Sequence, residues 1–166
     1  MKKFLFIVFL SLIASSAFND SFAVNHVIKP MEIENNFSQD KVKIVTKLFD
    51  GNNYDISKIR KKTILIFWVK WCKICKMQLE ILNNIQPQLI AKNIQTFGIS
   101  VDNAQDYEEA KKISATLPFK NANYYDAKLI SVKQPRAVPT TLLLDENQKI
   151  IKVYQGLIDE KQILEF

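Results

Sequence analysis

An apolar run in the middle of the chain is followed directly by a helical pattern. Residues 63–69, TILIFWV, are β-branched and aromatic without a polar break, which predicts a strand buried on both faces of a sheet. Beyond it, apolar side chains recur at helical spacing, separated by charged and amide residues. The members of this apolar series are Ile74, Met77, Ile81, Ile85 and Leu89. Together the two patterns predict a buried strand that leads into an amphipathic helix.

The rest of the chain alternates between strand and helix patterns. Residues 94–101 predict a strand and residues 103–117 a helix. Two further strands, at 140–145 and 149–155, are joined by a tight polar turn, and a short helix at 157–166 closes the chain. This order predicts an α/β fold in which a central sheet carries helices on both faces.

The first 23 residues have the layout of a secretory signal peptide. Two lysines precede an apolar run over residues 4–14, and small and polar residues follow it. The apolar run is shorter than the roughly 20 residues that a membrane span needs. We expect cleavage after Ala23, with residues 15–17 as a second candidate site, and an uncleaved inner-membrane anchor as the alternative. A polar lead-in, 24–41, and one domain, 42–166, would then lie in the periplasm or another exported location.

Composition and charge narrow the class of protein. Hydrophobic residues make up 48% of the 166 residues, which suits a folded domain with its own core. The net charge of +6 comes from lysines that are scattered among acidic residues rather than gathered in a stripe. Nucleic acid is therefore not expected as a partner. We expect a monomer.

The only two cysteines, Cys72 and Cys75, stand between the predicted strand and the predicted helix. A structural disulfide across so short a loop would stabilise little, because the benefit grows with loop length. A zinc site needs about four ligands, yet the one histidine is His26 in the lead-in, and Met77 is the only other soft ligand nearby. No metal is expected, although a two-coordinate Cu(I) site on the Cys-x-x-Cys loop stays open as an alternative. Redox chemistry is the favoured interpretation.

Position distinguishes the two thiols. Cys72 would lie in the first turn of the helix, where unpaired backbone N–H groups stabilise an anion. Lys70, Lys73 and Lys76 add positive charge around it. Thiols in such places commonly have a pKa of roughly 3.5–7.5 rather than about 8.5. Cys72 is therefore predicted to be the attacking thiolate, and Cys75, one turn further in, the more buried sulfur that resolves the mixed disulfide.

Two segments resemble motifs of the thioredoxin fold: FWVKWCKIC at 67–75 and AVPTTLLLDENQKI at 137–150. More narrowly, the chain over 42–166 resembles the exported TlpA/ResA-type thiol–disulfide oxidoreductases. The resemblance implies a thioredoxin-like fold, with a central mixed β-sheet flanked by helices. It also implies an N-terminal β-hairpin extension and lead-in strand within residues 47–68.

The same resemblance implies a substrate groove. In it the Val138–Pro139 bond is cis and lies against the two sulfurs, where the Val138 backbone can pair with an extended client segment. A trans proline at the start of a strand is the alternative. Trp71 is expected to be a partly exposed ring beside Cys72 that shapes this groove, with simple packing as the alternative.

Three positions depart from the pattern of the family. Ile66 stands where many thioredoxin-fold enzymes have a buried acid, Gln78 where TlpA/ResA-type proteins often have glutamate, and Glu80 where proline is common. Gln78 cannot act as a base. Glu80 is expected to be a solvated helix residue, with an acid–base role through water as the alternative. Lys73 and Ile74, between the cysteines, leave no place for the histidine that strong oxidants often carry there. Without that histidine, and with no second group to stabilise the thiolate, a reductase is favoured. Ile66 and Gln78 are expected to slow proton transfer at Cys75, and Lys73, Ile74 and Gln78 are the residues expected to tune the pair.

The resulting expectation is a thiol–disulfide oxidoreductase that reduces disulfides in other exported proteins. A membrane electron-donor protein would re-reduce it, since the sequence has no motif for a small-molecule cofactor. One task that the resemblance implies is to keep the haem-attachment cysteines of cytochromes c reduced. A disulfide oxidase, a Cu(I)-handling protein and a redox-inert binding module are the alternatives.

Overall fold

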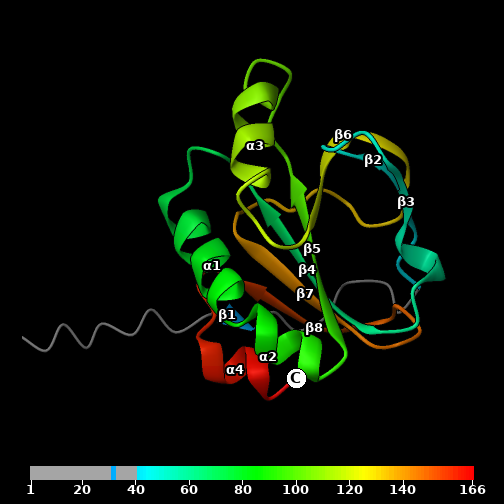
Figure 1. Cartoon of the computed structure of the whole chain (residues 1–166), viewed down its shortest axis with the longest axis vertical. Coiled ribbons are helices and arrows are strands. Elements are labelled where there is room, and N and C mark those ends of the chain that lie inside the picture. Colours follow the sequence, from blue (N-terminus) through cyan, green and yellow to red (C-terminus); the bar gives the residue numbers. More distant parts are fainter. Residues whose placement is uncertain (1–30, 33–40) are drawn as a thin grey trace, which may run out of the picture.

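The computed structural model describes residues 31–32 and 41–166, which form an eight-stranded mixed β-sheet (Figure 1). Its strands are β1 (Met31–Glu32), β2 (Ile44–Leu48), β3 (Asn53–Asp55), β4 (Lys62–Trp68), β5 (Ile94–Ser100), β6 (Lys120–Ile130), β7 (Thr140–Leu144) and β8 (Ile150–Gln155). They lie in the order β1-β8-β7-β4-β5-β6-β2-β3. Strands β4, β5 and β6 run parallel, and every other neighbouring pair is antiparallel.

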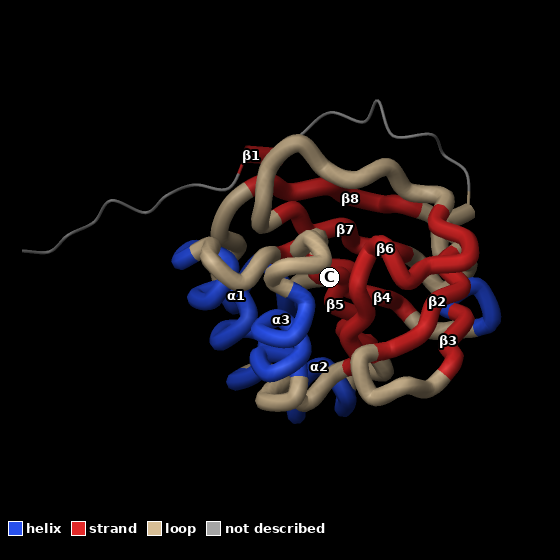
Figure 2. Tube along the Cα trace, turned by 90° about the horizontal axis from the view of Figure 1, so that it is seen from above, coloured by secondary structure: helices blue, strands red, loops and turns tan. Residues whose placement is uncertain are grey.

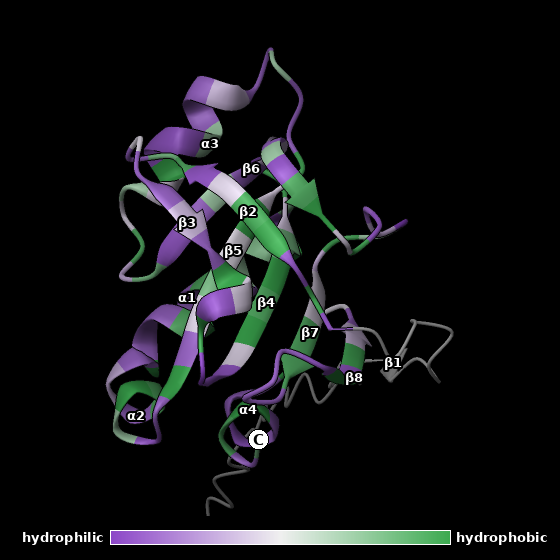
Figure 3. Cartoon of the chain, turned by 90° about the vertical axis from the view of Figure 1, so that its right-hand side faces the viewer, coloured by the Kyte–Doolittle hydropathy of each residue, from purple (hydrophilic) through white to green (hydrophobic). Residues whose placement is uncertain are grey.

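Side chains of β4, near the middle of the sheet, alternate between two separate cores. Ile64, Ile66 and Trp68 belong to one core, whereas Leu65 and Phe67 belong to the other. Because both faces are covered, the strand is apolar along most of its length, which Figure 3 shows by its colour.

The four α-helices of the described residues pack on the face of the sheet that carries Ile66. They are α1 (Lys73–Asn84), α2 (Gln86–Ala91), α3 (Tyr107–Ser114) and α4 (Glu160–Leu164), and Figure 2 shows the first three together on one side. Their buried residues Leu82, Ala110 and Ile163 join the core of Ile66. The other face is covered by β2 and the 3-10 helix η1 (Ile56–Lys58), through residues such as Ile56. The expectation of helices on both faces is therefore wrong for the α-helices of the described part of the chain, and the second face carries a 3-10 helix instead.

Most predicted elements are confirmed with small shifts of their ends. Strands β4, β5, β7 and β8 and helix α4 lie where the sequence predicts them. The helix predicted over 103–117 is shorter, since residues 104–106 form a turn before α3. The single helical pattern after Cys72 is divided into α1 and α2, because Ile85 ends the first and caps the second. Strand β6 is not predicted by the sequence pattern.

The buried face of α1 differs from the predicted one. Met77 is 40% exposed, and Ile74 is only partly buried. The buried residues of α1 are Cys75, Gln78, Leu79 and Leu82. The helix is therefore rotated relative to its apolar series, and a polar residue, Gln78, occupies a core position.

The N-terminal hairpin is confirmed as β2 and β3, which pair antiparallel around a turn in which Gly51 has a φ of 90°. Within the lead-in, β1 pairs with β8, so residues 31–32 extend the sheet. The predicted signal peptide, 1–23, lies outside the described residues. Among those that are described, no helix has the length and apolarity needed to cross a membrane.

Candidate active site

The two cysteines lie at the N-terminus of α1, directly after β4. Cys72 is the N-cap residue, and its Sγ accepts a hydrogen bond from the Cys75 N–H at 3.0 Å. A disulfide bond joins the two sulfurs, with the Cα atoms 5.1 Å apart. Cys72 is 8% exposed, whereas Cys75 is 0% exposed. Both cysteines therefore have the predicted placement, while their roles in exchange stay a prediction.

The loop before β7 faces Cys72. The Val138–Pro139 bond is cis, as the resemblance implies, and Pro139 is buried. Cys72 Sγ lies 3.8 Å from the carbonyl oxygen of Val138. Because a disulfide sulfur carries no proton, this approach is a van der Waals contact in the oxidised form. After reduction, a Cys72 thiol could donate a hydrogen bond to the same oxygen.

Trp71 borders an open pocket beside the disulfide. Its side chain is 71% exposed, and together with Val138 it lines a hollow of about 360 Å³. Asp102, Tyr125 and Arg136 also line this hollow. A larger hollow of about 670 Å³, between α2, the end of α3 and the hairpin, contains none of the predicted site residues. The smaller hollow is therefore the one next to the disulfide, since Trp71 precedes Cys72 in the chain and Val138 contacts Cys72 Sγ.

The inner sulfur lies in apolar surroundings. Cys75 shares its core with Ile66, which is fully buried and offers no proton acceptor. Gln78, three residues beyond Cys75, is fully buried as well. Its Oε1 accepts the backbone N–H of Ile158 at 2.6 Å, while its Nε2 has no hydrogen-bond partner in the described part of the chain. Gln78 thus ties the segment before α4 to the active-site helix.

The two residues between the cysteines differ in burial. Lys73 is exposed, and Ile74 packs partly against the core. Glu80 is exposed, as expected of a solvated helix residue.

Lys70 differs from the expectation that it supports Cys72. Its Nζ forms ion pairs with Glu109 and, at 3.0 Å, with Asp106. Hydrogen bonds to Glu109 and then Asp106 raise the pKa of Lys70. Its charge is therefore largely compensated by two carboxylates, and the expectation that it adds positive charge at Cys72 is corrected.

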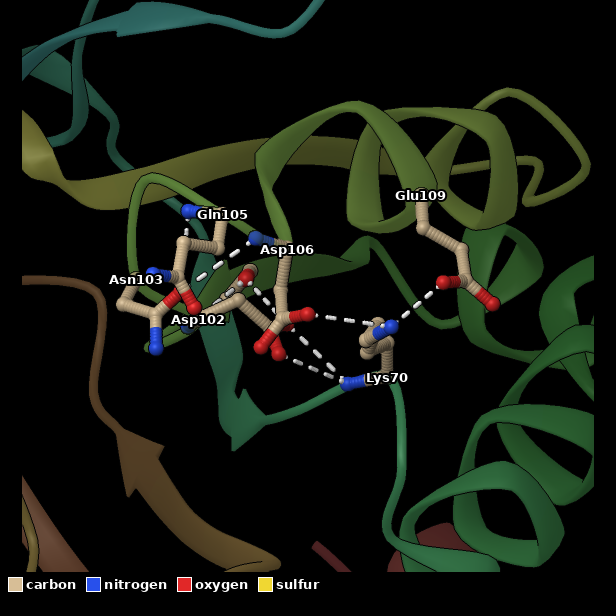
Figure 4. A network of polar contacts seen from close by, with 7 residues as sticks. Lys70, Asp102, Asn103, Gln105, Asp106 and Glu109 are labelled. Atoms are coloured by element: carbon tan, nitrogen blue, oxygen red, sulfur yellow. Dashed lines mark hydrogen bonds and ion pairs between the residues drawn. The ribbon is translucent and has the colours of Figure 1, made fainter.

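Asp102 is a site residue that the sequence interpretation missed. It lies two residues after the end of β5, which neighbours β4, and it is only 2% exposed. Its carboxylate accepts the Lys70 backbone N–H, at 3.0 Å to Oδ2 and 3.2 Å to Oδ1 (Figure 4). It also accepts the Ser100 hydroxyl at 2.7 Å. Burial raises the pKa of Asp102, and the hydrogen bonds from Ser100 and Lys70 partly oppose that shift. A carboxylate at the end of a parallel strand beside the Cys-x-x-Cys strand is the signal that could have indicated it.

The arrangement suits a two-step exchange of disulfides. Cys72, at a helix N-terminus, is 8% exposed, and the fully buried Cys75 is bonded to it, an order of exposure that suits stepwise exchange through a mixed disulfide. Among residues 31–32 and 41–166, no group of three or more histidine, cysteine, aspartate or glutamate side chains is arranged to hold a metal ion.

Comparison with known proteins agrees with this chemistry. The model of the AhpC/TSA family matches residues 36–165. The thiol-disulfide oxidoreductase ResA of Bacillus cereus is 22% identical over 169 residues, which cover 100% of this chain and 96% of that protein.

Solved structures show the same fold. StoA from Bacillus subtilis has a TM-score of 0.59 and 21% identity, and a putative thiol:disulfide interchange protein DsbE from Chlorobium tepidum has a TM-score of 0.59 and 26% identity. Each comparison covers 77% of this chain and 98% of the other. The exposed lipoprotein thioredoxin Etrx1 from Streptococcus pneumoniae has a TM-score of 0.62 and 22% identity, over 74% of this chain and 96% of its own. The predicted thioredoxin-like fold is therefore confirmed.

Proposed function

This chain belongs to the AhpC/TSA family, as a thiol–disulfide oxidoreductase of the thioredoxin fold, and from that premise we propose that it reduces disulfides in other exported proteins. The observation that carries the proposal is the Cys72–Cys75 disulfide at the N-terminus of α1, where Cys72 follows Trp71 and contacts Val138, two residues that line an open hollow. Reduction of the haem-attachment cysteines of cytochromes c is one task within this proposal.

The proposed cycle begins with the reduced pair. The Cys72 thiolate attacks one sulfur of a client disulfide, and a mixed disulfide forms while the first client thiolate leaves. Cys75 then loses its proton and attacks Cys72 Sγ, which releases the second client thiolate and forms the Cys72–Cys75 disulfide. Two electrons pass to the client, whose thiolates take up protons from water.

The surroundings of Cys72 support the reducing direction. Stabilisation of the reduced thiolate turns a dithiol into an oxidant. In the described part of the chain Cys72 Sγ accepts a hydrogen bond from a neutral backbone group, the Cys75 N–H, and the neutral Val138 carbonyl lies in van der Waals contact with it. The charge of Lys70 is compensated by Asp106 and Glu109. A weakly stabilised thiolate favours a pair that gives electrons away.

Export and re-reduction belong to the same proposal. The layout of residues 1–23 supports a cleaved signal peptide, and the structurally similar Etrx1 is an exposed lipoprotein. In an oxidising compartment the pair needs a supply of electrons. We assign that supply to a membrane electron-donor protein, with this chain acting as a monomer.

The equilibrium reduction potential of the Cys72–Cys75 pair tests the proposal. Equilibration against glutathione and dithiothreitol couples is expected to give a value near the reductant end of the fold, about −270 mV, rather than the oxidant end, about −120 mV. A value near the oxidant end would overturn the reductase and favour a disulfide oxidase. Stoichiometric Cu(I) binding without measurable exchange would overturn the enzyme altogether.

A further inference from the structure

The turn that carries Trp71 and Cys72 needs an anchor outside β4. Cys72 N–H donates to the Val69 carbonyl at 3.3 Å, which closes the turn at one end. Lys70 N–H, two residues before Cys72, donates instead to Asp102, a residue 32 positions further along the chain. The start of the turn is therefore held by a side chain from the end of the neighbouring strand.

Asp102 is itself held in place. Its carboxylate accepts the Ser100 hydroxyl, and its backbone N–H donates to Ser100 Oγ at 3.1 Å. Its backbone carbonyl accepts the side-chain amide of Asn123, on β6, at 3.0 Å. A buried carboxylate with fixed partners on β5 and β6 can hold the turn rigidly relative to the sheet.

Asp106 and Glu109, the two outer acids of the network, contact the side chain of Lys70 and not its backbone (Figure 4). Asp106 and Glu109 bind the Nζ atom at the end of a long side chain, and the Glu109 side chain is 63% exposed. Asp102 binds the backbone, so it alone of the three acids fixes the path of the chain towards Cys72. Substitution of Asp106 can therefore serve as a control for substitution of Asp102.

We propose that Asp102 is a positioning residue for Cys72: its carboxylate oxygens, by accepting the Lys70 backbone N–H, fix the turn that presents Cys72 Sγ and Trp71 to the groove beside Val138. The inference rests on the proposed function, because positioning matters only if Cys72 reacts. Asp102 acts here as a hydrogen-bond acceptor, and it is given no part in proton transfer.

Three variants test the proposal through the alkylation rate of Cys72 in the reduced protein. Asp102→Ala removes the acceptor, and we expect iodoacetamide to react with Cys72 roughly tenfold more slowly. Asp102→Asn keeps an acceptor oxygen of the same size, and Asp106→Ala removes an outer acid. Both are expected to stay within about twofold of the unchanged protein, since the Lys70 N–H keeps its partner.

A second measurement does not depend on the alanine variant folding. The Lys70 amide should exchange with deuterium slowly in the unchanged protein and in Asp102→Asn. Rapid exchange in the unchanged protein would overturn the proposal. So would equal slowing of alkylation by Asp102→Asn and Asp102→Ala, which would make charge the cause, or equal slowing by Asp106→Ala.

The same experiment keeps the two proposals apart. Alkylation and amide exchange require no client, so they report on positioning even if the protein reduces no disulfide. Absence of disulfide exchange by the unchanged protein, with the predicted ranking of alkylation rates, would remove the proposed function and leave Asp102 as the anchor of the turn.

Discussion

The two sulfurs of a single disulfide lie in very different surroundings. Cys72, which is 8% exposed, lies at a helix N-terminus beside a polar network that joins β4, β5 and α3. Cys75 is fully buried against Ile66, and Gln78, on the same buried face of α1, is a neutral amide. The surroundings of Cys72 therefore suit the predicted attacking thiolate, whereas Ile66 and Gln78 offer no carboxylate that could take the proton from Cys75.

The largest expected effect separates the roles of the two sulfurs. Cys75→Ser removes the resolving thiol, so mixed disulfides between Cys72 and client proteins should accumulate. Cys72→Ser removes the attacking thiol and should trap none. Non-reducing electrophoresis of the exported fraction, with mass spectrometry of the trapped clients, measures both. If Cys72→Ser traps clients and Cys75→Ser does not, the comparison is inverted.

This asymmetry could be predicted only in part from the sequence. The apolar run before Cys72 and the motif around Pro139 are local, so they predict β4, the helix start and the resemblance. The identity of the buried face of α1 is not local. Gln78 is buried because the Ile158 N–H, 80 residues away, requires an acceptor, and Met77 is then left exposed.

Two further features could not be predicted without the tertiary structure. Strand β6 mixes buried and exposed residues without a clear period, because it pairs with β5 over Lys120–Asn123 and, with register shifts, with β2 over Ala122–Ile130. Asp102 gives no sequence motif of its own. It becomes a site residue only because parallel pairing brings the end of β5 beside the end of β4.

A second prediction concerns a carboxyl group introduced near Cys75. Gln78→Glu should speed disulfide reduction near neutral pH if proton removal from Cys75 limits the rate. The Ile158 N–H can still donate to one carboxylate oxygen, but the other oxygen would be buried without a donor. We expect a loss of about 1–3 kcal/mol in the free energy of unfolding at neutral pH.

The pH dependence of that loss has a definite sign. Burial would raise the pKa of the carboxyl group that Gln78→Glu introduces above its value in the unfolded chain, about 4.3. The variant should therefore approach the stability of the unchanged protein below that pH and lose stability as the pH rises through the folded value. Gln86→Glu, at another buried glutamine, is the matched control and should lose stability without any gain in rate. Equal rates for both variants would contradict a role for proton removal at Cys75.

A third prediction concerns helix α3, which carries Glu109 of the polar network near Cys72. Tyr107, on α3, donates to Asp126 at 2.9 Å, and burial, followed by that hydrogen bond, raises the pKa of Tyr107 to about 12. Since the folded pKa is higher than the ordinary value near 10, the stabilisation is complete below about pH 10 and is lost as the pH rises through about 12.

Tyr107→Phe should remove this dependence. Between about pH 9 and 12 the difference in melting temperature between the unchanged protein and Tyr107→Phe should shrink by about 2 °C. Tyr125→Phe, at a ring that is 64% exposed, is the control and should keep a constant difference. A constant difference for Tyr107→Phe would show that the Tyr107 hydroxyl does not hold α3.

The smallest expected effect concerns Lys73 and Lys76, the exposed lysines near Cys72. Lys73 and Lys76 are exposed on the first turn of α1, so their charges are screened by salt and act weakly on the Cys72 thiolate. Lys73→Gln with Lys76→Gln should slow alkylation of Cys72 by about two- to threefold at low ionic strength and have no effect near roughly 0.5 M salt. Lys70→Gln with Asp106→Asn is the matched control, because it removes an ion pair and leaves the net charge unchanged. That control should alter the rate less than the first pair at every salt concentration. A larger effect from the control would mean that Lys70 acts on Cys72 after all, and the polar network of the outer side would then tune the sulfur by charge as well as by position.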